Sequence, residues 1–337
     1  MKEGKTLTQP RITTPKSTYT FDYPAAVKFA ETQREVFWLP DEINVEKDIQ
    51  DLRVNMTEAE RHGVITVLKL FTLYELLVGN EYWNGRVATS FPRPDIAMMA
   101  NAFGFFEINV HAPFYNKLNE AMLLNTDEFY SSYADDEALK SRIDFVNAAA
   151  DDENLLYSLA TFSMLEGAVL YSSFAFLKSF QSQGKNLLNN VCRGINFSVR
   201  DENLHSMAGA WLFQTLLEES ELDASELAEL QYDILQAADH VLAHEQRIIE
   251  MIFEKGPISG ITQNEMITFV KSRINLCLDH LGIFEEDDMY WVPENPVAEW
   301  FYKGINSTQF HDFFNGTGSE YNRNYDDAGF DFVMEDE

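Results

Sequence analysis

The stretch RDENLH, residues 200–205, places an arginine, two acids and a histidine inside a long run of helical periodicity. In a helix, Glu202 and His205 lie three residues apart, so their side chains share one face and can bind the same metal ion. An ExxH pair alone is equally compatible with an exposed glutamate beside a hydrogen-bonded histidine. Its meaning therefore depends on whether other helices supply matching ligands.

A second pair of this kind occurs upstream, at Glu107 and His111 in FGFFEINVHAPFY (103–115). Two further apolar stretches carry one glutamate each, Glu81 in LVGNEYWNGR and Glu166 in FSMLEGAVLY. Considered alone, Glu81 is equally compatible with a surface residue, and Glu166 is equally compatible with a buried acid that has a partner. Together, one glutamate from each of two helices and a Glu/His pair from each of two others are typical of ferritin-like dinuclear carboxylate proteins. Four carboxylates and two imidazoles suit two iron or manganese ions, because hard oxygen ligands offset the charge of the metals.

The upstream pair departs from this pattern because Glu107 and His111 are four residues apart. Pro113 offers a reason, since it has no N–H to donate to the carbonyl of Asn109 and its ring crowds that carbonyl. The helix must kink or widen there. We expect a π-bulge within residues 107–112 that brings Glu107 back to the metals.

Apolar residues recur at spacings of three and four, whereas the alternation typical of strands is rare, so the fold is expected to be all-α. Capping boxes at Thr57/Glu60 and Thr262/Glu265 mark two helix starts. We expect a ferritin-like bundle over residues 21–303, a flexible segment over 1–20 and a flexible acidic tail over 304–337. The expected helices cover residues 57–87, 95–124, 135–149, a stretch from a cap at Asp151 or Asp152 to Gly184, 186–218, 225–254 and 262–282.

Composition limits the function classes. The 337 residues are 45% hydrophobic and carry a net charge of −30, which is unfavourable for nucleic-acid binding. No uncharged run reaches membrane-spanning length and no signal peptide is evident, so we expect a cytoplasmic protein that does not bind membranes. The two cysteines, Cys192 and Cys277, are expected to be buried free thiols.

Two more motifs are Glu81 followed by Gly85 and Arg86, and VFWLPDEI with Trp38. With these motifs and RDENLH itself, the chain resembles, between about residues 20 and 300, the small, radical-generating subunit of class I ribonucleotide reductase. The resemblance implies that Trp38 relays charge, that Asp201 connects it to His111, and that Tyr115 stores a radical in many members. It also implies a C-terminal tail that docks on the large subunit and carries a relay tyrosine, for which Tyr321 and Tyr325 are the candidates.

The resemblance further implies a homodimer with two metal ions per chain, Fe/Fe, Mn/Mn or mixed, and a flavoprotein activase if the metal is manganese. Its activity would be the reduction of ribonucleoside di- or triphosphates together with the large subunit, because this chain has no P-loop and no reducing dithiol. Ser198 and Leu170 depart from the residues that often pack near the radical tyrosine, so storage on Tyr115 or on the metals both remain open. The alternative function is a stand-alone ferritin-like metal oxidase.

Overall fold

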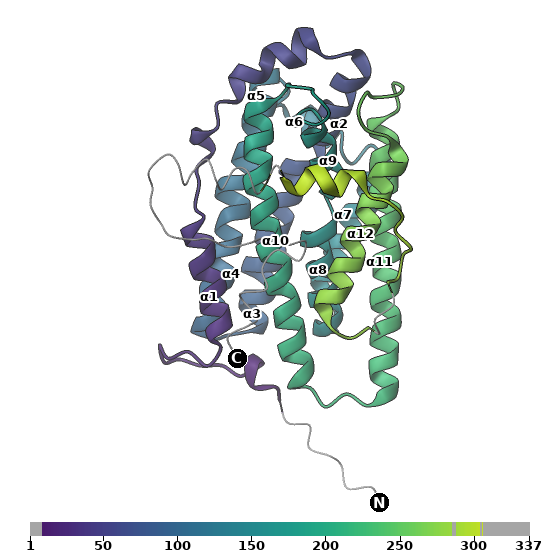
Figure 1. Cartoon of the computed structure of the whole chain (residues 1–337). Coiled ribbons are helices and arrows are strands. Elements are labelled where there is room, and N and C mark those ends of the chain that lie inside the picture. Colours follow the sequence, from purple (N-terminus) through teal and green to yellow (C-terminus); the bar gives the residue numbers. More distant parts are fainter. Residues whose placement is uncertain (1–8, 285–287, 304, 306–337) are drawn as a thin grey trace, which may run out of the picture.

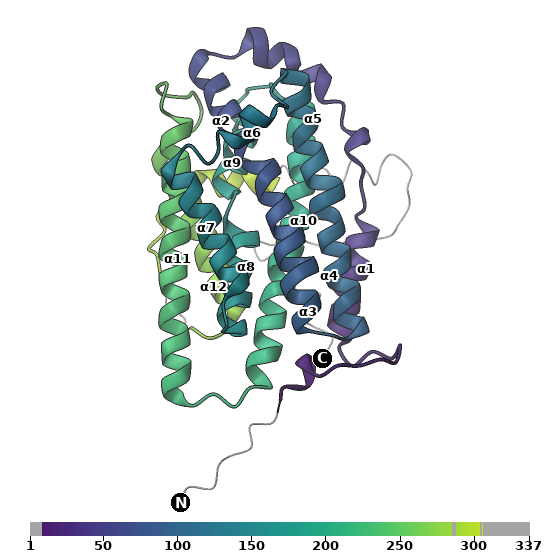
Figure 2. The same cartoon turned by 180° about the vertical axis from the view of Figure 1, so that it is seen from behind.

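The computed structural model describes residues 9–284, 288–303 and 305. Regular secondary structure in this part of the chain is entirely helical, which confirms the predicted all-α class. Long helices run side by side along one axis, as Figures 1 and 2 show from opposite sides. The α-helices are α1 Pro24–Glu35, α2 Glu58–Leu77, α3 Ala88–Ser90, α4 Pro94–Phe106, α5 Ala112–Met122, α6 Asp127–Ser131, α7 Glu137–Asp151, α8 Leu155–Ala168, α9 Tyr171–Ser179, α10 Asn189–Glu218, α11 Ala224–Ile252 and α12 Gln263–Leu281. The other helical turns are the 3-10 segments η1 Arg11–Thr13, η2 Pro40–Glu42 and η3 Val45–Asp48 and the π segments η4 Asp51–Asn55, η5 Val78–Val87 and η6 Glu107–His111.

Local sequence signals explain where the long helices begin. The capping boxes at Thr57 and Thr262 form as predicted at the starts of α2 and α12, and Asp223 forms another at the start of α11. One predicted cap is wrong. Asn154 caps α8, because its side chain accepts from two backbone N–H groups, whereas Asp151 is the last residue of α7.

Three predicted helices are interrupted. Residues 57–87 divide into α2 and the π-helix η5, and residues 95–124 divide into α4, η6 and α5. The helix expected to end at Gly184 breaks after Ala168, where Leu170 takes a left-handed conformation with φ of 73°. All three interruptions fall within or just beyond the stretches that carry the candidate ligands.

The N-terminal region differs from the prediction of a flexible segment over 1–20. Ile12 is fully buried, and its backbone N–H donates to Glu219 at 2.6 Å. Arg93 donates to the carbonyls of Arg11 and Thr14 at 3.1 and 2.9 Å. Residues 9–14 are therefore attached to the bundle, while residues 1–8 and 306–337 lie outside the described part of the chain.

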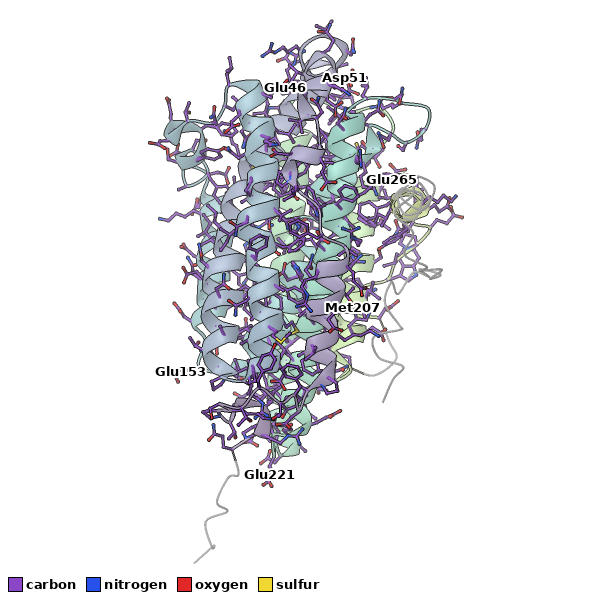
Figure 3. All side chains as sticks on the ribbon, turned by 90° about the vertical axis from the view of Figure 1, so that its left-hand side faces the viewer. Glu46, Asp51, Glu153, Met207, Glu221 and Glu265 are labelled. Carbon is purple, nitrogen blue, oxygen red and sulfur yellow. The ribbon has the colours of Figure 1, made fainter. Side chains whose placement is uncertain are left out.

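The core consists of buried side chains shared by most of these helices, with α8 and α10 packed most extensively on each other. Two helical stretches, Glu58–Ser90 and Leu155–Ser179, are long and apolar enough to span a membrane. Their apolar windows are 69% and 100% buried inside the bundle, so they act here as core helices. Acidic side chains lie at both ends of the bundle, with Glu46 and Asp51 near one end and Glu153 and Glu221 near the other (Figure 3).

Candidate metal centre

Six buried side chains from four parts of the bundle meet in its interior. Their ligand atoms form two groups, and within each group all atoms lie within 4.8 Å of one another. Glu107 and Glu202 belong to both groups, so they are positioned between the two. The first group is Glu75, Glu107, His111 and Glu202, and the second is Glu107, Glu166, Glu202 and His205.

The structure does not bring the predicted ligand Glu81 to this cluster. Glu81 is exposed on η5, and Glu75 of α2, 1% exposed, supplies the carboxylate instead. Glu75 is one turn after Phe71 and three residues before Val78, both fully buried, so it continues the apolar stripe of α2. The buried stripe was the signal that would have identified Glu75, whereas the nearby Gly-Arg motif drew the assignment to Glu81.

The predicted π-bulge is confirmed. Residues Glu107–His111 form the π-helix η6, and Pro113 lies at the start of the following helix α5. The extra residue in this turn directs the side chains of both Glu107 and His111 inward, and both are fully buried. Glu107 thereby contributes an oxygen to each ligand group.

His111 faces the carboxylates with one ring nitrogen and an outer acid with the other. Its Nδ1 lies 2.9 Å from Glu107 Oε2 and 3.1 Å from Glu202 Oε1, and 3.9 Å from Glu75 Oε2. Its Nε2 lies 3.2 Å from Asp201 Oδ2. With a proton on Nε2 donated to Asp201, the Nδ1 lone pair is free to bind a metal ion.

His205 repeats this arrangement with a neutral outer partner. Its Nδ1 lies 2.6 Å from Glu107 Oε1, and its Nε2 lies 3.0 Å from Gln33 Oε1 of α1. Trp83 Nε1 donates to Glu166 Oε1 at 2.6 Å. Gln33 and Trp83 were not among the predicted site residues.

The site has two halves. The His111 half consists of Glu75 and His111 with Asp201 and Trp38, and the His205 half consists of Glu166 and His205 with Gln33 and Trp83.

The charges of the cluster match divalent cations. Burial and neighbouring carboxylates raise the pKa values of Glu75, Glu166 and Glu202. Burial alone would also raise the pKa of Glu107, but His111 and His205 outweigh it and hold that pKa below its usual range. The ion-pair partners of the four carboxylates within the described residues are the two histidines. Two divalent cations would offset the remaining negative charge, so the residues fit a dinuclear metal site.

The His111 half continues outward through Asp201 and Trp38. Trp38 Nε1 donates to Asp201 Oδ2 at 2.7 Å, and this is the same oxygen that faces His111 Nε2. Trp38 is 2% exposed, and its ring lies 6.0 Å from that of His111 between centroids. Arg200 lies 3.4 Å from the other oxygen of Asp201 and donates to the carbonyl of Val36 at 2.6 Å. The three residues named by the family resemblance are therefore in direct contact.

Tyr115 lies one turn beyond His111, on α5, and is fully buried. Its ring stacks on Phe71 with centroids 4.3 Å apart. Burial, and then the charge of Glu75, raise the pKa of the phenol well above its usual value. A hydrogen bond with the hydroxyl of Ser198 opposes this rise but does not outweigh burial. Tyr115 is thus a buried, neutral phenol near the His111 half.

The remaining predicted residues divide in two. Cys192 and Cys277 are buried free thiols, as predicted. The relay candidates Tyr321 and Tyr325 lie outside the described residues.

The sequence matches the family model described as ribonucleotide reductase, small chain, over residues 16–296. A probable ribonucleoside-diphosphate reductase small subunit of Invertebrate iridescent virus 3 is 25% identical over 321 residues, which cover 89% of this chain and 82% of that protein. The ribonucleoside-diphosphate reductase subunit beta of Mycobacterium tuberculosis is 24% identical over 293 residues, covering 85% of each.

Solved structures share the fold. The dimanganese(II) form of NrdF from Streptococcus sanguinis superposes with a TM-score of 0.75 at 22% identity, covering 87% of this chain and 99% of that one. The ribonucleotide reductase R2 subunit of Clostridium botulinum has a TM-score of 0.71 at 20% identity, covering 84% and 89%. With a family match that spans most of the chain and a ferritin-like helical fold, this protein belongs to the ribonucleotide reductase small-chain family, the small subunits of the class I enzyme.

Proposed function

We propose that this small subunit binds two metal ions, iron or manganese, through Glu75, Glu107, His111, Glu166, Glu202 and His205. The observation that carries the proposal is the pair of overlapping ligand groups, each with three carboxylates and one imidazole within 4.8 Å. Six oxygen and nitrogen donors of this kind suit redox-active first-row metals. The dimanganese content of the Streptococcus sanguinis relative supports manganese as one of the two metals to test.

The bound metals would supply an oxidising equivalent after reaction with oxygen or a reduced oxygen species. The protein's own residues set up the site for this chemistry. Asp201 and Gln33 accept the Nε2 protons of the two histidines and so fix the tautomer that presents Nδ1 inward. Buried aromatic rings, among them Trp83 and Phe103 against His205, keep water away from the centre.

The oxidising equivalent then leaves through the His111 half. His111, Asp201 and Trp38 form a continuous hydrogen-bonded path, which is the route we assign to charge moving toward the large subunit. The Asp201 carboxylate accepts hydrogen bonds from both His111 and Trp38. Oxidation of the Trp38 ring can therefore be balanced by a shift of its N–H proton to this carboxylate. Tyr115, or the metals when they are bound, would store the equivalent before transfer.

The large subunit is the partner that binds and reduces the ribonucleotide, a diphosphate or a triphosphate. We assign its docking to the acidic tail over 304–337, with Tyr321 or Tyr325 as the last relay. The acting form is a cytoplasmic homodimer, activated through a flavoprotein if the metal is manganese. The names of the relatives support the diphosphate as the first substrate to test.

Electron paramagnetic resonance (EPR) of the full chain, loaded separately with Fe(II) and Mn(II) and then oxidised, tests the proposal. An organic radical that disappears in Tyr115→Phe assigns storage to Tyr115, and a signal with metal hyperfine structure that persists in Tyr115→Phe assigns it to the metals. Trp38→Phe should form either signal normally yet lose nucleotide reduction with the large subunit. Binding well below two ions per chain, or full activity of Trp38→Phe, would contradict the proposal.

A further inference from the structure

Arg273 of α12 is a buried arginine whose contacts converge beside the metal centre. It is 2% exposed, and its guanidinium carbon lies 4.1 Å from the centre of the Tyr171 ring. Its Nε donates to the carbonyl of Gly167 at 2.8 Å, and its Nη2 donates to Asn203 Oδ1 at 2.7 Å. The hydroxyl of Tyr171 donates to the same Asn203 oxygen at 2.8 Å. All three contacts are with residues next to the candidate ligands or to the break between α8 and α9.

Two of these contacts adjoin ligands directly, because Gly167 follows Glu166 and Asn203 follows Glu202. The carbonyl of Gly167 belongs to the last turn of α8, where carbonyl groups have no partner within the helix. Arg273 satisfies that carbonyl and so fixes the end of α8. One planar guanidinium therefore holds the backbone beside Glu166 and the side chain beside Glu202 at the same time.

Close to Arg273, α8 and α10 are in tight contact and are joined by hydrogen bonds. A Cβ atom on Gly167 would lie 2.4 Å from both Cys277 Sγ and Ser206 Oγ, so the helices approach as closely as glycine allows. Ser163 and Ser206 also donate to each other's carbonyls at 2.8 Å. This junction sets the spacing between the helices that carry Glu166 and Glu202.

The third hydrogen bond of Arg273 leads to the C-terminal segment. Its Nη1 donates to the hydroxyl of Tyr302 at 2.9 Å. Tyr302 belongs to a helical segment over residues 296–303, drawn in yellow across the long helices in Figure 1, just before the chain leaves the described region. Phe301 of this segment is fully buried, with its ring centroid 4.7 Å from that of Phe269 on α12. The segment is thus docked on the same helix that carries Arg273.

We propose that Arg273 is a positioning residue that couples the segment 296–303 to the His205 half of the metal centre through the hydrogen bond to Tyr302. The inference rests on the proposed dinuclear site. Through this coupling, movement of the segment 296–303 changes the placement of Glu166 and Glu202. A partner bound at the C-terminus and metals bound at the centre therefore affect each other. Such coupling is reciprocal for binding free energies.

Manganese titration of the full chain tests the positioning role. Arg273→Lys keeps the charge but cannot bond three acceptors in the fixed fork of arginine. It should weaken the binding of one of the two Mn(II) ions by about tenfold. This is the lower end of the loss in affinity seen when groups that support ligands are removed. That ion should be the one whose binding is weakened most in Glu166→Gln, and the other ion, which shares Glu202, should be weakened less. Tyr302→Phe, which removes one hydroxyl, should weaken the same ion less.

Two matched variants control for loss of a buried arginine and of a phenol elsewhere. Arg93→Lys removes a buried guanidinium that binds the carbonyls of Arg11 and Thr14, and Tyr290→Phe removes a hydrogen bond to Asp239. Neither should change Mn(II) affinity. If Arg273→Lys does not fold, Tyr302→Phe against Tyr290→Phe still decides the outcome, and equal affinities for both would overturn the inference.

Hydrogen exchange distinguishes this coupling from a purely structural role of Arg273 in packing. In the wild type, loading with Mn(II) should slow exchange of the amides of residues 296–303, and in Arg273→Lys this effect of the metal should disappear. If the exchange rates of these amides in the wild type are the same with and without Mn(II), the coupling is contradicted, whereas the proposed dinuclear site is not. A wild type that binds fewer than two ions would instead count against the proposed function.

Discussion

The two halves of the metal centre share a plan and differ in how each ends. In both, a histidine presents Nδ1 to the carboxylates and directs Nε2 to an outer acceptor. In the His111 half that acceptor is Asp201, which Trp38 also contacts. In the His205 half it is the neutral amide of Gln33, whose Nε2 has no hydrogen-bond partner among the described residues.

On the basis of this difference we propose separate tasks for the two halves. A carboxylate next to an indole can accept a proton and stabilise positive charge, so the His111 half provides a path outward. An amide fixes the orientation of a ring but cannot take up its charge, so the His205 half holds the metals in place. The variants below test this division, beginning with the one that removes what the halves share.

Replacing Glu107, which contributes to both ligand groups, should collapse both halves at once. Glu107→Ala should lower metal affinity by about a hundredfold or more, since losing a ligand costs more than losing the support of a ligand. Metal analysis after gel filtration should then find fewer than one ion per chain. Glu81→Ala is the control and should keep two ions, because Glu81 is exposed and outside both groups. Loss of metal in Glu81→Ala would contradict the assignment of Glu75.

The outer acceptors should then separate the halves. Asp201→Asn keeps an oxygen beside His111 but removes its charge, so metal content should stay at two ions while nucleotide reduction with the large subunit falls about a hundredfold. Gln33→Leu should weaken Mn(II) binding about tenfold and leave the rate unchanged at saturating metal. Steady-state assays and manganese titrations measure both. Equal behaviour of the two variants would show that the halves do not differ in function.

Site residues that lie close together along the chain could be predicted from the sequence, whereas residues far apart could not. Glu202 and His205 lie in one helix turn, and Pro113 explained the four-residue spacing of Glu107 and His111, so these pairs could be placed before the fold was known. Glu75 has no ligand partner on its own helix, so only its place on the buried stripe distinguished it from Glu81.

Contacts between distant segments could not be predicted in this way. Gln33 and His205 are 172 residues apart, and Arg273 and Gly167 are 106 apart. Periodicity and capping describe single helices, whereas these contacts depend on how α1 and α12 pack against the others. The contact of Trp38 with Asp201 was expected only because of the family resemblance.

Within the His205 half, Trp83 should matter for metal binding alone. Trp83→Phe keeps an aromatic ring against Phe103 but loses the N–H that donates to Glu166 at 2.6 Å. Loss of one hydrogen bond to a charged group costs about 1.5 kcal/mol, so Mn(II) affinity should fall about tenfold. Manganese titration checks this, and the oxidised EPR signal at full loading should be unchanged. A loss of nucleotide reduction at full loading would mean that charge also leaves through the His205 half.

The last prediction concerns stability alone, without an effect on activity, and tests the burial of a lysine outside the His205 half. Lys178 of α9 is buried, with Nζ 4.5 Å from the centre of the Phe301 ring, and burial lowers its pKa from 10.5 to about 7. The unfolded chain therefore binds this proton more tightly than the folded chain, and stability should rise with pH between about 7 and 10.5 by at most about 1.4 kcal/mol per pH unit. Lys178→Met should remove that slope in denaturant unfolding, whereas replacing the exposed Lys140 with methionine should keep it. A slope that survives in Lys178→Met would mean that a group other than Lys178 titrates over this pH range.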